Sequence, residues 1–192
     1  MDAVVMCGGR GTRLGADAEK PLFEVAGRPM VDRVCDALAA SRADSVYTAV
    51  SPHAPATREH VRERTDCTII ETPGEGYVAD LGTVLDDDRI AEPVLTCVAD
   101  LPLLAPALVD ETLAAAHDRD GESLTVAVPA ALKECLGVSS DTTKPHEGRT
   151  VAPVGLNVVG SAGDAVRLSY DARLAVNVNR TADASVAERL LE

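Results

Sequence analysis

One stretch near the start of the chain decides the fold: Ala3-Val4-Val5-Met6-Cys7-Gly8-Gly9-Arg10-Gly11-Thr12-Arg13-Leu14-Gly15. Its first four residues form a continuous apolar run, which is typical of a strand buried on both faces of a parallel sheet. The glycines at positions 8, 9 and 11 let backbone N–H groups approach an anion closely. Arg10 and Arg13 add positive charge, and no acid lies between Gly8 and Gly15. The stretch therefore predicts a strand followed by an anion-binding loop.

Similar apolar runs recur and alternate with segments of helical spacing. Strands are expected at 3–6, 46–50, 67–70, 94–98, 124–128, 156–159 and 174–176. Helices are expected at 30–38, 55–64, 77–85, 106–117 and 181–191, the last with Thr181 as its N-cap. The alternation predicts one domain over residues 1–192, of the α/β class and Rossmann-like. We expect a mostly parallel central sheet with helices on both faces, and a ligand crevice at the carboxyl ends of the strands.

The charge balance excludes several classes of partner. The chain has 192 residues and a formal net charge of −13, from 31 acidic and 18 basic residues. Generic binding to nucleic acid or to an anionic membrane surface needs a cationic face, so neither partner is expected. No apolar run approaches the ~18 residues that a membrane span requires. A polyanionic ligand would need local positive charge, which the glycine-rich loop supplies.

The kind of charged residue is also informative. Asp outnumbers Glu, and only Lys20, Lys133 and Lys144 are lysines, so that arginine supplies most of the basic residues. We interpret this composition as adaptation to high salt, where a Debye length of about 3 Å at 1 M weakens the repulsion between carboxylates. The alternative is an acidic protein of an ordinary mesophile.

Five cysteines are scattered along the chain at positions 7, 35, 67, 97 and 135, with no C-x-x-C pair. An odd, scattered set indicates reduced thiols that serve mostly as small core residues. The first residues lack the basic segment and apolar core of a secretory signal. These features together predict a cytoplasmic protein.

The glycine-rich loop differs from two better-known phosphate-binding loops. It lacks the Gly-Lys-Ser/Thr ending of a P-loop, and Leu14 stands where a dinucleotide fingerprint has its third glycine. The longer pattern, which continues to Glu19-Lys20-Pro21, is more specific than a lone glycine-rich turn. A purely structural turn with surface arginines is the alternative.

This longer pattern resembles the signature of the nucleotidyltransferases that include molybdenum-cofactor guanylyltransferases and sugar-phosphate nucleotidylyltransferases. Within that superfamily the chain is most similar to the archaeal adenosylcobinamide-phosphate guanylyltransferases of cobalamin biosynthesis. The likeness extends over segments 51–57, 71–81, 98–101, 154–159 and 176–179, whereas segment 137–150 departs from the pattern. The resemblance implies a nucleotide-diphospho-sugar transferase-like fold. It also implies Mg²⁺-dependent transfer of GMP from GTP to adenosylcobinamide phosphate, with release of pyrophosphate.

The resemblance also implies roles for residues of the first loop. Arg13 and Lys20 would bind the GTP phosphates and stabilise the charge that develops in the reaction, with Gly8, Gly9, Gly11 and Thr12 around them. The ammonium of Lys20 suits this role, because a compact charge can follow a phosphate as its geometry changes. For Lys20 the alternative is a solvated loop residue.

Asp100 follows the apolar run 94–99, which places its carboxylate at the crevice edge of a buried strand. Mg²⁺ prefers one or two carboxylates together with phosphate oxygens, and the family has a metal-binding aspartate here. Asp100 is therefore the expected metal ligand and a catalytic residue. A cap for the following turn is the alternative.

Three further sets of residues are candidates for contact with the nucleotide or the acceptor. Thr72, Gly74 and Gly76 lie between a strand and a helix, where resemblance implies nucleotide selection and a tight turn is the alternative. Asp80, in the helix that follows, is either a site residue or a simple surface residue. A last set, Gly155, Asn157, Asn177 and Asn179, either binds ligand or ties strands together, since a buried amide needs partners.

Three matters stay open at this point. The acceptor could instead be molybdopterin or a sugar phosphate on the same fold. A non-catalytic GTP-binding module is the alternative from another class, and it is disfavoured by the presence of both Lys20 and Asp100. The oligomeric state, monomer or homodimer, is not determined by the sequence.

Overall fold

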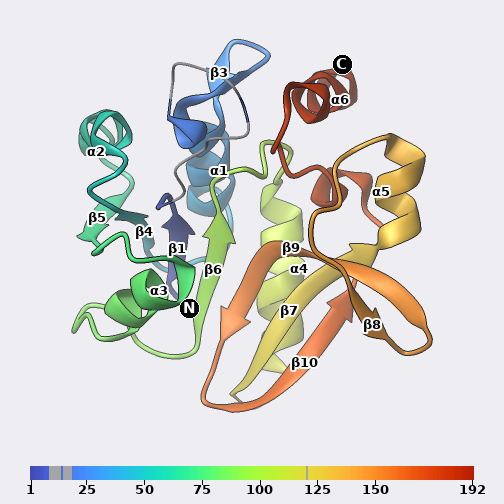
Figure 1. Cartoon of the computed structure of the whole chain (residues 1–192). Coiled ribbons are helices and arrows are strands. Elements are labelled where there is room, and N and C mark those ends of the chain that lie inside the picture. Colours follow the sequence, from blue (N-terminus) through green and yellow to red (C-terminus); the bar gives the residue numbers. More distant parts are fainter. Residues whose placement is uncertain (9–13, 15–18, 120) are drawn as a thin grey trace.

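The computed structural model describes residues 1–8, 14, 19–119 and 121–192, and within them the chain forms a mixed sheet flanked by helices (Figure 1). Seven strands follow the order β10-β7-β9-β6-β1-β4-β5, and an eighth, β8, pairs with β9. Their bounds are β1 (Ala3–Met6), β4 (Val46–Val50), β5 (Thr68–Glu71), β6 (Val94–Val98), β7 (Glu122–Pro129), β8 (Lys144–His146), β9 (Arg149–Val159) and β10 (Ala162–Leu168). A small antiparallel pair, β2 (Glu24–Val25) and β3 (Arg28–Pro29), stands apart from this sheet.

The half of the sheet that contains β6, β1, β4 and β5 is parallel throughout, as the apolar runs predict. Alternate residues of β1 enter different cores because both faces are covered. Val5 packs in the core that holds Val31 of α1 (Met30–Ala39) and Val109 of α4 (Pro106–His117). Val4 packs in the core that holds Val84 of α3 (Tyr77–Leu85). The predicted α/β class, with a mostly parallel sheet and helices on both faces, is therefore confirmed.

The other half of the sheet departs from the predicted pattern. β9 runs antiparallel between β6 and β7, and β10 lies parallel to β7 at the edge. β8 and β10 were not expected from the sequence. The strand expected at 174–176 is wrong, because Ala172–Ala175 form a short 3-10 helix, η2. The Asp171 carboxylate accepts a hydrogen bond from the Arg173 amide at 2.9 Å and so caps this turn.

The predicted helices are all present, with small changes at their ends. α1 and α2 (Pro55–Arg62) begin at the expected residues, and α6 spans Thr181–Leu191. Thr181 is the first helical residue and not the N-cap; Arg180 takes that position, and its amide donates to Asp183. The sequence did not predict α5 (Ala130–Leu136), a helix that packs against β7, β9 and η2.

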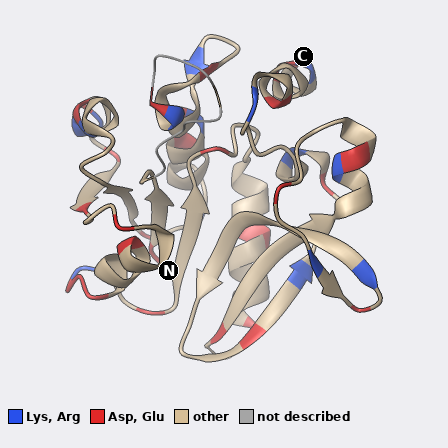
Figure 2. Cartoon of the chain, viewed as in Figure 1, with Lys and Arg blue, Asp and Glu red and all other residues tan. Residues whose placement is uncertain are grey.

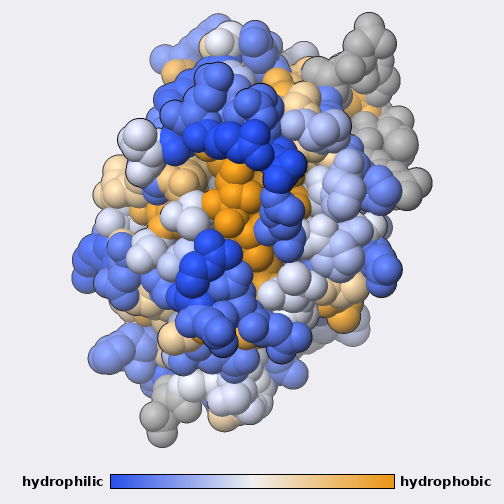
Figure 3. Space-filling model, turned by 90° about the vertical axis from the view of Figure 1, so that its left-hand side faces the viewer, coloured by the Kyte–Doolittle hydropathy of each residue, from blue (hydrophilic) through white to orange (hydrophobic). Residues whose placement is uncertain are grey.

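The surface agrees with the acidic composition. Acidic and basic residues interleave over helices and loops, whereas the central strands β1, β4 and β6 contain neither (Figure 2). On the face formed by α2, β5 and α3, hydrophilic residues surround an apolar hollow (Figure 3). Cys7, Cys35 and Cys97 are buried as expected, while Cys67 is half-buried and Cys135 is exposed; all five thiols are free. Within the part of the chain that the structure describes, no helix has the length and apolarity to cross a bilayer.

Candidate active site

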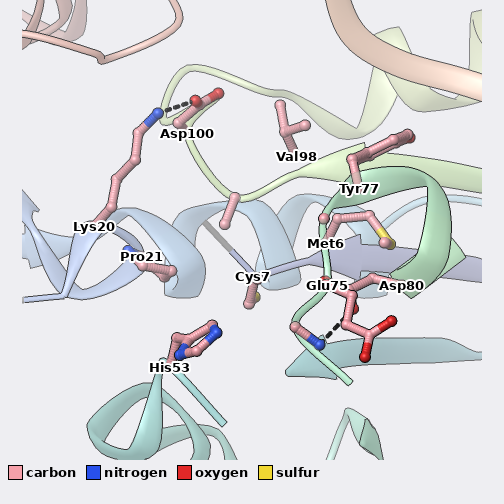
Figure 4. A pocket seen from close by; sticks show the side chains of 14 residues that line it. Met6, Cys7, Lys20, Pro21, His53, Glu75, Tyr77, Asp80, Val98 and Asp100 are labelled. Atoms are coloured by element: carbon pink, nitrogen blue, oxygen red, sulfur yellow. Dashed lines mark hydrogen bonds and ion pairs between the residues drawn. The ribbon is translucent and has the colours of Figure 1, made fainter. Parts of the chain in front are cut away.

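A cavity of about 490 Å³ opens at the carboxyl ends of β1 and β6, where the sequence predicts the crevice (Figure 4). Among the described residues, segments after β1, β4 and β6 and the loop between β5 and α3 enclose it. Its lining residues are Met6, Cys7, Gly8, Lys20, Pro21, His53, Gly74, Glu75, Gly76, Tyr77, Asp80, Val98, Ala99 and Asp100. We call it the first cavity.

At one end of the first cavity, the Asp80 carboxylate holds one glycine-containing segment and lies close against another. Its Oδ1 accepts a hydrogen bond from the Gly74 amide at 2.7 Å. Its Oδ2 lies 2.6 Å from the place that a Cβ on Gly8 would occupy, so only glycine fits there without a shift. Asp80 is 3% exposed, which makes the surface-residue interpretation wrong. The residue therefore positions the cavity wall from the first turn of α3.

At the other end, Lys20 and Asp100 form an ion pair, which Figure 4 shows. Lys20 begins the short helix η1 (Lys20–Leu22), and its ammonium also donates to Asn179 Oδ1 at 2.7 Å. The preceding residue, Glu19, holds this segment against α2 by accepting from the amides of Ala56 and Thr57 at 2.9 and 2.7 Å. The structure thus brings together Lys20, Asp100 and Asn179, three site residues expected from the sequence.

A second cavity, of about 470 Å³, adjoins the first and shares Tyr77, Val98 and Asp100 with it. Its other lining residues are Lys133, Ser139, Ser140, Asp141, Thr142, Pro153, Val154, Gly155, Asn157, Asn177 and Asn179. At Gly155 the backbone has φ +81°, and an added Cβ would lie 2.5 Å from Val98 Cγ2. Glycine is required there because β9 and Val98 approach so closely. Asn157 lies on β9 opposite Thr96 of β6 and Thr125 of β7.

Asn177 connects Asp100 to the floor of the second cavity. Its Nδ2 donates to Asp100 Oδ1 at 2.9 Å and to the Val154 carbonyl at 2.8 Å. Its Oδ1 accepts from Lys133 Nζ at 3.1 Å, so the whole amide is engaged. Asn177 therefore links the segment after β6 to β9, as the structural interpretation expects. It also lines the second cavity, and a contact of Asn177 with a ligand stays a prediction.

Lys133 was not identified as a site residue from the sequence. It lies on α5, is only 3% exposed, and donates to the Ala175 carbonyl at 2.8 Å as well as to Asn177. Burial lowers the pKa of the Lys133 ammonium, while the nearby carboxylates of Asp100, Asp183 and Asp141 oppose that shift. The only signal in the sequence was its rarity, as one of three lysines.

Asp183 is a second residue that the sequence analysis missed. Its carboxylate is 1% exposed and accepts from the amides of Ser139, Asn179 and Arg180 at 2.7, 3.0 and 2.8 Å. It also accepts from the Ser139 hydroxyl at 2.8 Å. Asp183 therefore joins two walls of the second cavity, the segment after α5 and the segment before α6.

The remaining expected residues are placed as follows. Gly9, Gly11, Thr12 and Arg13 lie outside the described residues, so their phosphate contacts stay predictions. Gly76 lines the first cavity. Thr72 is 5% exposed and lines neither cavity, and its hydroxyl finds no hydrogen-bond partner among the described residues. A contact of Thr72 with the nucleotide also stays a prediction.

The donors around Asp100 fit a divalent cation that takes most of its ligands from substrate. The Asp100 carboxylate lines both cavities and lies beside the Asn179 amide oxygen, because Lys20 binds both groups. Both are hard oxygen donors of the kind that Mg²⁺ takes. Within residues 1–8, 14, 19–119 and 121–192, no cluster of three His, Cys, Asp or Glu side chains could hold a metal alone. A metal here would therefore depend on phosphate oxygens.

Comparison with known proteins identifies the family. Residues 3–180 match the MobA-like NTP transferase domain. An adenosylcobinamide-phosphate guanylyltransferase from Methanocaldococcus jannaschii is 30% identical over 205 residues, covering 100% of this chain and 98% of that protein. A bifunctional protein GlmU from Bifidobacterium adolescentis is 30% identical over 130 residues, 65% of this chain and 28% of that protein.

Solved structures support the same fold. The chain superposes on a CMP:2-keto-3-deoxy-manno-octonic acid synthetase complexed with CTP, with a TM-score of 0.68 and 14% identity over 99% of this chain and 97% of the other. A Bacillus anthracis structure, described as a glucose-1-phosphate thymidylyltransferase, gives a TM-score of 0.73 and 11% identity over 99% and 94%. At such identities the likeness concerns the fold alone. The sequence match over nearly the whole length shows that the chain belongs to the family of MobA-like NTP transferase domains.

Proposed function

We propose that this protein transfers GMP from GTP to adenosylcobinamide phosphate, giving adenosylcobinamide-GDP and pyrophosphate. The observation that carries the proposal is the meeting of two cavities at Asp100, since a transfer reaction needs donor and acceptor side by side. The choice of GTP and of this acceptor is supported by the name of the full-length relative from M. jannaschii. Mg²⁺ is the proposed metal.

The first cavity is the proposed GTP site. Backbone amides of Gly8, Gly9 and Gly11, together with Thr12, would receive the phosphates, because a glycine-rich loop presents N–H groups without side chains in the way. Thr72, Gly74, Gly76 and Asp80 lie on the segment proposed for base and ribose. Asp80 acts there by holding the Gly74 amide in place.

Lys20, Arg13 and Asp100 are the proposed catalytic residues. An oxygen of the acceptor phosphate forms a bond to the α-phosphorus of GTP, and the bond between that phosphorus and the bridging oxygen of pyrophosphate breaks. The nucleophile is already anionic, so no general base is needed. Lys20 and Arg13 would neutralise charge on the transferred and leaving phosphates. A Mg²⁺ held by Asp100 would supply further neutralisation and alignment of those phosphates.

The second cavity is the proposed acceptor site. Gly155, Asn157, Asn177 and Asn179 line it next to Asp100. Asn177 would keep Asp100 oriented through the 2.9 Å hydrogen bond to Oδ1, which leaves Oδ2 directed at Lys20. The nucleophilic phosphate would enter beside these amides.

The decisive experiment measures pyrophosphate release from GTP, Mg²⁺ and adenosylcobinamide phosphate. It is run in concentrated KCl, because we propose from the composition and the five free thiols that the protein works in a salty, reducing cytoplasm. We expect release that depends on the acceptor and is greatest with GTP among the four nucleoside triphosphates. Release with molybdopterin or a sugar phosphate instead would reassign the acceptor, and GTP binding without release would indicate a non-catalytic module.

A further inference from the structure

Lys133 is a buried cation that has no carboxylate in direct contact among the described residues. Its ammonium is held by two neutral oxygens, the Ala175 carbonyl at 2.8 Å and Asn177 Oδ1 at 3.1 Å. An ammonium has three N–H donors, and these two bonds use two of them. No described carboxylate forms an ion pair with it, although three carboxylates lie near enough to influence its pKa. Burying a charge without a carboxylate in direct contact is costly, so a reason for retaining it is expected.

Among the charged residues that line the second cavity, Lys133 is again the one without an ion-pair partner among the described residues. Its two lining carboxylates are both matched by other cations: Asp100 pairs with Lys20, and Asp141 pairs with Arg180 at 2.7 Å. Lys133 is the single cation among the described residues that line this cavity. The cavity therefore has an available positive charge at its floor, which fits an anion and not a neutral ligand.

The position of Lys133 relative to the reaction site is set by Asn177. One end of that amide contacts Lys133 and the other contacts Asp100, so the ammonium and the carboxylate are joined by a single side chain. An oxyanion bound to Lys133 would thus lie on the Asp100 side of the second cavity. Such an oxyanion would be held next to the α-phosphate of a nucleotide in the first cavity.

We propose that Lys133 binds the phosphate group of the acceptor, an alkyl phosphate monoester, and holds it for attack. This inference rests on the proposed function, because it assumes that the second cavity takes the acceptor. It adds a binding residue that neither the sequence pattern nor the comparisons assign. The rival interpretation is that Lys133 only holds Asn177 and the carbonyl of Ala175 in place.

The test compares two ligands that differ only by the phosphate, adenosylcobinamide phosphate and adenosylcobinamide. Binding is measured by calorimetry on the full chain with Mg²⁺ and a non-hydrolysable α,β-methylene analogue of GTP, so that no turnover occurs. We expect wild type to prefer the phosphate-bearing ligand, and Lys133→Gln to lower that preference by about 10- to 100-fold. Lys144→Gln is the matched control, because Lys144 lies on β8 and lines neither cavity.

The outcomes separate the two interpretations. An unchanged preference in Lys133→Gln, or equal weakening of both ligands, would overturn the inference, because a merely structural role affects both ligands alike. A second measurement uses wild type alone: the ¹⁵Nζ resonance of Lys133 should shift with the phosphate-bearing ligand and not with the other. An unmoved resonance would also overturn the inference. Failure of wild type to bind either ligand and to release pyrophosphate would instead overturn the proposed function.

Discussion

Lys20 donates a hydrogen bond to Asp100, although 80 residues separate them in the chain. Lys20 lies in η1 after the glycine-rich segment, and Asp100 follows β6, so the pair joins the first loop to the centre of the sheet. Asp100 lines both cavities, whereas Lys20 lines only the first. The contact therefore stands at the boundary between the proposed nucleotide and acceptor sites, where the transferred phosphate would pass.

The first prediction concerns this pair. Lys20→Ala and Asp100→Ala should each lower kcat for acceptor-dependent pyrophosphate release by about 10²- to 10³-fold, because one removes a positive charge from the transition state and the other removes the proposed Mg²⁺ ligand. The double variant should lose little more than either single variant, since residues that act as a unit are not additive. The midpoint temperature of thermal unfolding should be the same in each variant as in wild type, which shows that the variants are folded. Activity of either single variant within about threefold of wild type would remove the pair from the catalytic machinery.

The second prediction concerns Gly8. A methyl group on this residue would lie 2.6 Å from Asp80 Oδ2, so Gly8→Ala must displace the carboxylate that holds the Gly74 amide. We expect the Kd for GTP to rise at least about tenfold, a loss of about 1.4 kcal/mol or more. Isothermal titration without acceptor measures this directly.

Gly82→Ala is the matched control for Gly8→Ala. Gly82 lies in the same helix as Asp80, and an added Cβ there would meet nothing within 4 Å. Alanine in a helix interior should raise the free energy of unfolding by roughly 0.5–1 kcal/mol and leave GTP affinity unchanged. Equal GTP affinity in the two variants would refute the placement of the nucleotide against Gly8.

The parallel half of the fold was predictable because local sequence determines it. The run Ala3–Met6 is apolar at every position, and only a strand covered on both faces needs such a run. The antiparallel position of β9 was not predictable, since the partners of a strand lie far along the chain. The run Leu174–Val176 was misassigned because a short apolar run can equally be a buried turn. Here Leu174 and Ala175 are buried in a 3-10 helix.

The site residues, like the strands, were predictable only where a local sequence pattern marks them. Lys20 and Asp100 stood out because a rare lysine follows a glycine-rich loop and an aspartate ends a buried strand. Lys133 did not, because Ala130–Leu136 has the composition of an ordinary surface helix, and the packing of α5 on β7, β9 and η2 involves residues far along the chain. Asp183 resembled the acidic residue commonly found in a first helical turn. Its bonds to Ser139 cross 44 residues and leave no local pattern.

The third prediction concerns Asp183. Asp183→Asn replaces an oxygen that accepts hydrogen bonds with an NH₂ group that faces donors, inside a site that is 1% exposed. We expect the free energy of unfolding to fall by about 2–4 kcal/mol, measured by urea denaturation. The exposed Asp86 at the end of α3 is the matched position, and Asp86→Asn should change stability by no more than about 0.5 kcal/mol. Similar losses in both variants would mean that Asp183 does not organise the second cavity.

The fourth prediction concerns salt, because the surface brings carboxylates close together. Arg64 contacts the carboxylates of Asp32, Asp36 and Asp66 at 3.1, 2.8 and 2.6 Å, so three anions gather around one guanidinium. Because the net charge is −13, added salt should weaken the repulsion between like charges more than the attraction between opposite charges. The free energy of unfolding should therefore rise between 0.1 and about 2 M KCl. Chloride is chosen because sulfate would also strengthen apolar burial. Stability that is flat or falling with KCl would contradict salt adaptation and favour an ordinary acidic protein.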